Sequence, residues 1–154
     1  MPLQSNSKTM AEKLFTSAEK GQIVDAIKTA EVTTSGEIQV HIENHCKGEV
    51  LDRAAEVFET LKMYQTKDRN GVLFYLAVQD HKFAILGDAG INRVVPEDFW
   101  EKIKNHMTSL FKEGKFTQGL IDGIHQAGEA LSTHFPYQGE ADENELPDEI
   151  SFGS

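Results

Sequence analysis

The sequence predicts a single α/β domain with a small mixed sheet, and two patterns carry that prediction. Residues 37–43 alternate apolar and polar side chains, which is the period of a strand with one buried face. Residues 72–78 form a nearly continuous apolar run, which is typical of a central strand covered on both faces. Helical spacing of apolar residues precedes, separates and follows these runs. The expected order of elements is therefore α-β-α-β-β-α-α.

The helices are predicted from their apolar stripes and from the residues that begin or end them. Thr16 followed by Glu19 has capping-box spacing, so it opens the first helix. Pro96 opens a later helix, because proline fits the first helical position. Gly114 ends that helix, and Pro136 ends the last one. Helical spacing covers four ranges, which are 16–30, 48–63, 96–113 and 116–135.

The connections between the strands predict how they pair. Residues 79–81 have the composition of a short hairpin turn, so residues 83–86 are expected as a strand antiparallel to the one before. The strand-helix-strand unit from 36 to 78 is expected as a right-handed parallel crossover. Together these connections give a mixed sheet with helices available to cover its faces.

The length of 154 residues fits one domain with a sizeable core. We expect the domain over residues 16–136, with a flexible N-terminus over 1–15 and an acidic disordered tail over 137–154. That tail carries six acids and no Lys or Arg, which favours a solvated segment. The alternative is a docking segment, because apolar residues lie among its acids. They are Leu146, Ile150 and Phe152.

Charge and composition exclude some classes of partner. The formal net charge of −10 argues against nucleic acid and anionic membranes, and it permits a metal ion or a basic protein partner. The N-terminus has no apolar signal region, and no run of about 18 apolar residues that could insert into a membrane occurs. The single cysteine, Cys46, cannot form an intrachain disulfide. We expect an acidic, soluble, cytoplasmic protein.

Three polar loops are predicted to meet at one edge of the sheet. In a parallel pair both strands begin at the same edge, and the hairpin returns the third strand to it. The loops before the first and second strands and after the third supply Glu37, Asp68, Asn70 and Asp88. Carboxylate and amide oxygens are the ligands that calcium prefers, so a cation site is one interpretation. Asp, Asn and Gly are also ordinary turn residues, which is the other.

The same loops resemble a known family. Short motifs occur in order at 34–40, 69–78, 80–85, 87–91 and 111–116. Together they resemble the TPM domain, named for a thylakoid lumen protein, a photosystem II repair protein and a nematode receptor-associated protein. The likeness spans roughly 17–135.

The resemblance implies a Rossmann-like α/β/α sandwich, calcium in an acidic cleft in some members, and acid phosphatase activity in plant members. The matched polar positions are Glu37, Asp68, Asn70 and Asp88. The chain departs from the pattern at Arg69, where many members have a second acid, and at Asp88, where an aromatic is common. We expect neither the signal peptide nor the membrane anchor of many members, so the chain resembles a short bacterial type.

Two functions follow from these residues. The preferred one is an interaction module that binds a divalent cation, calcium or else magnesium. The alternative is metal-dependent hydrolysis of phosphomonoesters, in which Asp68 or Asp88 would position a water and Arg69 would contact the phosphate. No nucleophile stands out, because Ser35 has no evident base, so the catalytic residues stay unknown. His41 and His45 would lie about 13 Å apart on an extended strand, too far to share a zinc ion.

Overall fold

The computed structural model describes residues 10–137 and 148–153. Within them the chain forms one sheet, six α-helices and a short 3₁₀ helix. In chain order the elements are α1 (Met10–Lys13), α2 (Ser17–Glu31), β1 (Glu37–Glu43), α3 (Val50–Thr60), the 3₁₀ helix η1 (Met63–Gln65), β2 (Gly71–Ala77), β3 (Lys82–Gly87), α4 (Ala89–Val94), α5 (Phe99–Lys112), α6 (Phe116–His134) and β4 (Ser151–Phe152).

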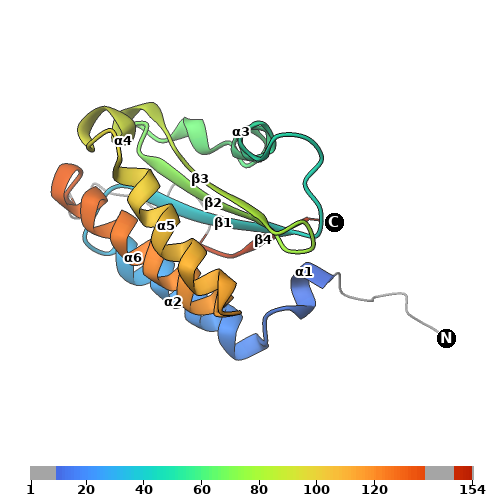
Figure 1. The fold of residues 1–154 in the computed structure, drawn as a ribbon. Helices are drawn as coiled ribbons and strands as arrows, with labels where there is room; N and C mark the ends of the chain where they lie inside the picture. Colours follow the sequence, from blue (N-terminus) through green and yellow to red (C-terminus); the bar gives the residue numbers. More distant parts are fainter. Residues whose placement is uncertain (1–9, 138–147, 154) are drawn as a thin grey trace.

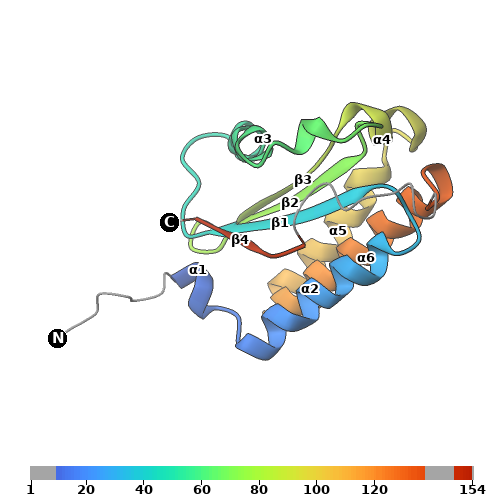
Figure 2. The ribbon, with the colours of Figure 1, turned by 180° about the vertical axis from the view of Figure 1, so that it is seen from behind.

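The sheet has the strand order β3-β2-β1-β4. β1 pairs with β2 in parallel, with Glu37 opposite Gly71, and β2 pairs with β3 antiparallel. The predicted crossover and hairpin are therefore confirmed. β4 adds a parallel edge strand beside β1, with His41 opposite Ser151 (Figure 2).

Helices cover both faces of the sheet, as the predicted α/β/α sandwich requires. Figure 1 shows α2, α5 and α6 packed on one face and α3 on the other. The main core lies under the three helices and includes Ile38, Val40 and Ile42 of β1, all 0% exposed. A smaller core lies under α3 and includes Leu73 and Tyr75 of β2.

The polar face of β1 is buried, although its alternation predicted one buried face. Residues opposite each other in neighbouring strands project to the same side of a sheet, so this face shares the α3 side with Leu73 and Tyr75. All seven residues of β1 are buried. The polar ones are Glu37, Gln39, His41 and Glu43. His41 and Glu43 have polar partners in place of water, whereas Gln39 Nε2 has no hydrogen-bond partner among the described residues.

The helix boundaries follow their sequence signals closely. Thr16 caps α2 in a reciprocal capping box with Glu19, as predicted. α5 begins at Phe99, later than Pro96, because residues 96–98 first form a turn closed by the Phe99 amide and the Pro96 carbonyl. Among the described residues, no helix has both the length and the apolar character needed to cross a bilayer.

Described segments near both ends of the chain contribute to the packed domain. Within the predicted flexible N-terminus, α1 forms, and Ala11 and Phe15 are 0% and 3% exposed. Within the predicted acidic tail, residues 148–153 include β4, and its Phe152 and the adjacent Ile150 pack against the main core. Residues 1–9, 138–147 and 154, including Leu146 and four of the tail acids, lie outside the described residues.

Candidate functional site

The three predicted loops do meet at the start of β1 and β2. The Asn70 carbonyl accepts a hydrogen bond from the Glu37 amide at 3.4 Å, and the Asn70 side-chain amide donates to Ser35 Oγ at 3.3 Å. The Gly90 amide donates to the Arg69 carbonyl at 2.8 Å. A Cβ on Gly90 would lie 2.0 Å from the Asp68 carbonyl oxygen, so only glycine permits this approach.

Arg69 and Asp88 form an ion pair across two of these loops. Arg69 Nε and Nη2 donate to the two Asp88 oxygens at 2.7 and 2.8 Å, and Asp88 also accepts from the Ala89 amide at the start of α4. Both oxygens of this predicted metal ligand therefore have donors, and the guanidinium predicted to contact phosphate is held by a carboxylate. The Asp68 side chain is exposed.

Asn70 carries a buried amide oxygen that has no hydrogen-bond partner among the described residues. The residue is 1% exposed, and its amide nitrogen is engaged by Ser35. A buried acceptor without a donor costs about 1–3 kcal/mol. This oxygen is therefore suited to accept a bond from water or to coordinate a cation.

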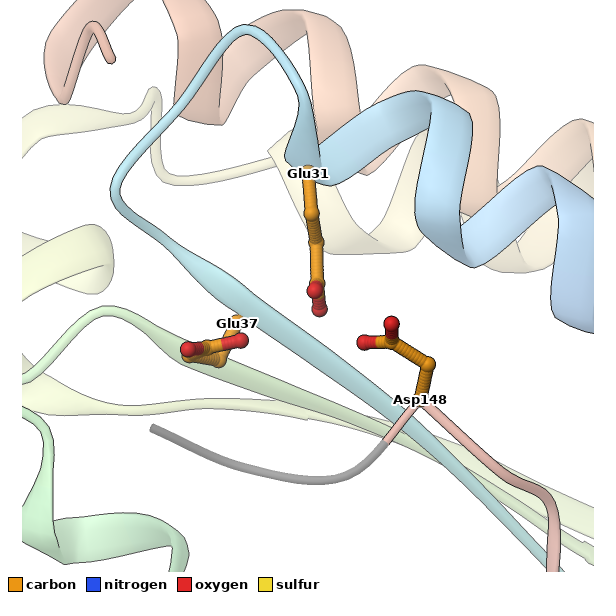
Figure 3. Close-up of side chains that lie close together, drawn as sticks. All are labelled: Glu31, Glu37 and Asp148. Carbon is orange, nitrogen blue, oxygen red and sulfur yellow. The ribbon is translucent and has the colours of Figure 1, made fainter. Parts of the chain in front are cut away.

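Three carboxylates from separate segments gather at the same end of β1. Glu31 ends α2, Glu37 begins β1, and Asp148 lies just before β4, with one ligand oxygen from each lying within 4.8 Å of the others. Figure 3 shows the three side chains directed toward a common space. Glu31 is anchored there, because its Oε2 accepts from the Ile38 amide at 2.8 Å.

The electrostatics of this acidic cluster (Glu31, Glu37 and Asp148) hold a proton on one of its members. Burial, a hydrogen bond with Asp148 and the charge of Glu37 raise the pKa of Glu31 to about 10. The cluster therefore keeps a proton at neutral pH when no cation is present. A divalent cation would take the place of that proton, and an all-carboxylate donor set fits a hard cation.

Sequence reasoning named Glu37 but missed Glu31 and Asp148. The two acids are brought together only when the tail returns beside β1. One signal for Glu31 was available, because an acid in the last turn of a helix opposes the helix dipole. The contacts of Glu31 within the cluster explain why an acid stands at this unfavourable helix position.

The other end of β1 carries a carboxylate with a cationic partner. Arg53 donates to both oxygens of Glu43 at 2.8 Å, and the Tyr75 hydroxyl and His41 Nε2 also contact that carboxylate. Burial works to raise the pKa of Glu43, but the hydrogen bonds from Arg53, Tyr75 and His41 outweigh it and lower the pKa to about 2. A cavity of about 500 Å³ adjoins this carboxylate. Its lining residues are Glu43, His45, Lys47, Arg53 and Glu56.

A family model, that of the TPM domain, matches residues 9–130. The chain belongs to the TPM domain family. One similar solved structure is the NMR structure of the BA42 protein from the psychrophilic bacterium Bizionia argentinensis. It is 49% identical, covers 97% of this chain and 99% of its own, and gives a TM-score of 0.81.

Two more distant structures share the TPM-like fold. The N-terminal domain of a P. gingivalis protein is 17% identical, covers 79% of each chain and has a TM-score of 0.64. The N-terminal domain of the cg2496 protein from Corynebacterium glutamicum is 10% identical, covers 100% of this chain and 95% of its own, and has a TM-score of 0.62. None of the curated proteins matches the chain.

Proposed function

We propose that this TPM domain binds a divalent cation, calcium in the first place, through Glu31, Glu37 and Asp148. One observation carries the proposal: three carboxylates from distant segments of the chain approach within 4.8 Å. Carboxylates held this close repel one another unless a proton or a cation lies among them. The bound cation would link the end of α2, the start of β1 and the C-terminal segment.

Calcium fits this donor set better than magnesium. Calcium takes six to eight oxygens in flexible geometry, and carboxylates can bind it through one or two oxygens each. Magnesium demands near-ideal octahedral geometry and retains several waters. Because the cluster joins two segments of the body to a separate C-terminal segment, its spacing can adapt to the larger ion. Magnesium is the second candidate.

Cation binding would fasten the C-terminal segment to the domain. Asp148 precedes β4, a strand of only two residues. A strand this short has few ladder hydrogen bonds, so its position depends on the groups that flank it. In this proposal the cation binds Asp148 and so holds β4 against β1. A protein partner that pairs with the edge of β1 would then be blocked by β4 when calcium is bound. The domain then acts as a calcium-dependent interaction module.

The sequence also predicted Asp68, Asn70 and Asp88 as ligands. In this second ligand set the buried Asn70 oxygen is available to bind a cation, whereas Asp88 could bind one only if its ion pair with Arg69 broke. Both ligand sets include Glu37, so an experiment must distinguish them through the ligands that they do not share. The arrangement around Glu31 is favoured because it brings three carboxylates together without breaking an ion pair.

A calcium titration followed by amide NMR tests the proposal, starting from protein freed of metal with EDTA and using magnesium as the control. We expect saturable shifts at Glu31, Glu37, Ile38, Asp148 and along β4. Shifts confined to 66–71 and 88–92 would assign the cation to the second arrangement. The absence of any shift up to millimolar calcium would overturn cation binding.

The alternative function, metal-dependent hydrolysis of phosphomonoesters, has less support in the geometry. Arg69 is paired with Asp88, and the hydroxyl of Ser35 accepts a hydrogen bond from an amide. Its test is turnover of p-nitrophenyl phosphate at saturating calcium. Turnover that disappears in Asp68→Asn or Asp88→Asn would establish it.

A further inference from the structure

A row of polar side chains crosses three strands on the α3 side of the sheet. Tyr75 of β2 lies opposite His41 of β1, and His41 lies opposite Ser151 of β4. His41 Nδ1 lies 2.8 Å from Ser151 Oγ, and its Nε2 lies 3.0 Å from Glu43 Oε1. The sheet register thus places a hydroxyl, an imidazole and a carboxylate in one hydrogen-bonded chain.

The direction of these hydrogen bonds follows from the charge of Glu43. This carboxylate is ionised at neutral pH, because its pKa is about 2, and it can only accept. His41 Nε2 must therefore carry the proton that it shares with Glu43. Burial also holds the pKa of His41 below its ordinary value, so the ring is neutral and its Nδ1 is an acceptor. The Ser151 hydroxyl then donates to Nδ1.

We propose that Ser151, His41 and Glu43 form a nucleophile, a base and an orienting carboxylate for acyl transfer, through which the domain hydrolyses small uncharged carboxylic esters. A serine bonded to a neutral imidazole, which a carboxylate orients in turn, is the arrangement that activates serine in unrelated hydrolases. Such a set is recognised by geometry and roles, because it recurs on unrelated folds. Arg53 and the Tyr75 hydroxyl hold Glu43 in place and act as positioning residues.

Access and charge decide the class of ester. Ser151 is half-buried on an edge strand, so it lies at the margin of the sheet. The cavity of about 500 Å³ beside Glu43 is lined by neither Ser151 nor His41, so an ester reaches Ser151 from the sheet edge and not through that cavity. Asp148 and Glu149 lie just before β4, and their negative charges repel a phosphate dianion. An uncharged carboxylic ester meets no such repulsion.

The reaction balances with water as the only co-reactant. Ser151 Oγ attacks the carbonyl carbon while its proton passes to His41 Nδ1, and Glu43 stabilises the imidazolium. The ester C–O bond then breaks, and the alcohol leaves with the proton from His41. Water attacks the acyl-Ser151 ester, gives a proton to His41, and the free acid departs as Ser151 regains its proton.

The test uses the full chain in EDTA, so that its outcome is independent of cation binding. The protein is treated with a fluorophosphonate probe, the adduct is located by peptide mass mapping, and hydrolysis of p-nitrophenyl acetate is followed in parallel. We expect one adduct on Ser151, its loss in Ser151→Ala, and labelling about 100-fold slower in His41→Gln. Labelling should also slow as the pH falls and His41 is protonated. Ser109→Ala, which changes an exposed serine on α5, is the matched control.

Absence of an adduct on Ser151 in the unmodified protein would overturn the proposal without reference to any variant. Labelling of Ser151 that is unchanged in a folded His41→Gln protein would overturn the role of His41 as base. In either case the chain of hydrogen bonds serves only to attach β4 to β1.

Discussion

The two ends of β1 present buried carboxylates in opposite electrostatic surroundings. At the Glu37 end the charged neighbours that shift Glu31 are acids, and the pKa of Glu31 rises to about 10. At the Glu43 end the Arg53 guanidinium donates to both carboxylate oxygens, and the pKa of Glu43 falls to about 2. Burial acts to raise both values, so the sign of the neighbouring charge decides the outcome. One end has its own cationic partner in Arg53, and the other gathers three acids.

The largest expected effect is at the paired end. Glu43→Gln leaves Arg53 without its bidentate partner and weakens the bonds from His41 and Tyr75. Because Arg53 is partly exposed, we expect a loss of about 2–4 kcal/mol in the free energy of unfolding. Urea unfolding in EDTA measures it. Glu56→Gln, which removes an exposed partner of the same arginine, should change stability by less than about 0.5 kcal/mol. Equal losses in the two variants would contradict this account.

At the acidic end the matching substitution should stabilise the protein when calcium is absent. Glutamine at position 31 resembles the protonated glutamate, keeps an acceptor for the Ile38 amide, and removes the cost of burying an acid. We expect Glu31→Gln to add about 1–2 kcal/mol at pH 8 in EDTA. Glu129→Gln, on the exposed face of α6, is the control. Destabilisation by Glu31→Gln in EDTA would show that the ionised carboxylate is favoured without a cation.

The two ends should also respond to pH in opposite directions. The raised pKa of Glu31 means that its protonated form stabilises the fold fully below about pH 4.5, and this stabilisation is lost as the pH rises toward 10. The lowered pKa of Glu43 means that its contribution is present above about 4.5 and is lost as the pH falls toward 2. Each group changes stability by up to about 1.4 kcal/mol per pH unit in its window.

Unfolding free energies of the unmodified protein and the two glutamine variants, measured from pH 3 to 9 in EDTA, separate these contributions from those of other groups. Subtracting the Glu31→Gln curve from that of the unmodified protein should leave a fall in stability on the alkaline side. Subtracting the Glu43→Gln curve should leave a fall on the acid side. Parallel curves for all three proteins would show that neither carboxylate titrates as described.

The smallest expected change in the free energy of unfolding comes from Gly21→Ala in α2, which tests helix stability apart from the electrostatics of the acidic cluster. Gly21 lies inside α2, and a Cβ there meets nothing within 4 Å. Gly21→Ala should therefore stabilise the protein by about 0.5–1 kcal/mol through helix propensity. Thermal unfolding should show the same gain with and without calcium. A gain that depends on calcium would mean that the cation acts through the whole helix.

Most of the fold could be predicted from local patterns, because the strands at 37–43 and 72–78 and the long helices each span enough residues to show a period. α1 and β4 could not, since a four-residue helix and a two-residue strand have none. Their positions depend on packing, as Phe15 and Phe152 illustrate.

The candidate site was predicted in part. The meeting of the three loops follows from strand order, and it places Glu37 correctly at the sheet edge. The partners of Glu37 in the cluster could not be predicted, because Glu31 and Asp148 approach one another only in the folded chain. The ion pair between Arg69 and Asp88 was missed for the same reason.

The central claim is that Glu31 and Asp148 bind the cation, and isothermal titration with calcium tests it most directly. The comparison sets Glu31→Gln and Asp148→Asn against Asp68→Asn, which neutralises an exposed acid of the neighbouring loop. We predict that calcium binds the first two variants at least about tenfold more weakly, which is about 1.4 kcal/mol, and binds Asp68→Asn with unchanged affinity. Unchanged affinity in Glu31→Gln and Asp148→Asn, with weaker binding in Asp68→Asn, would contradict the account.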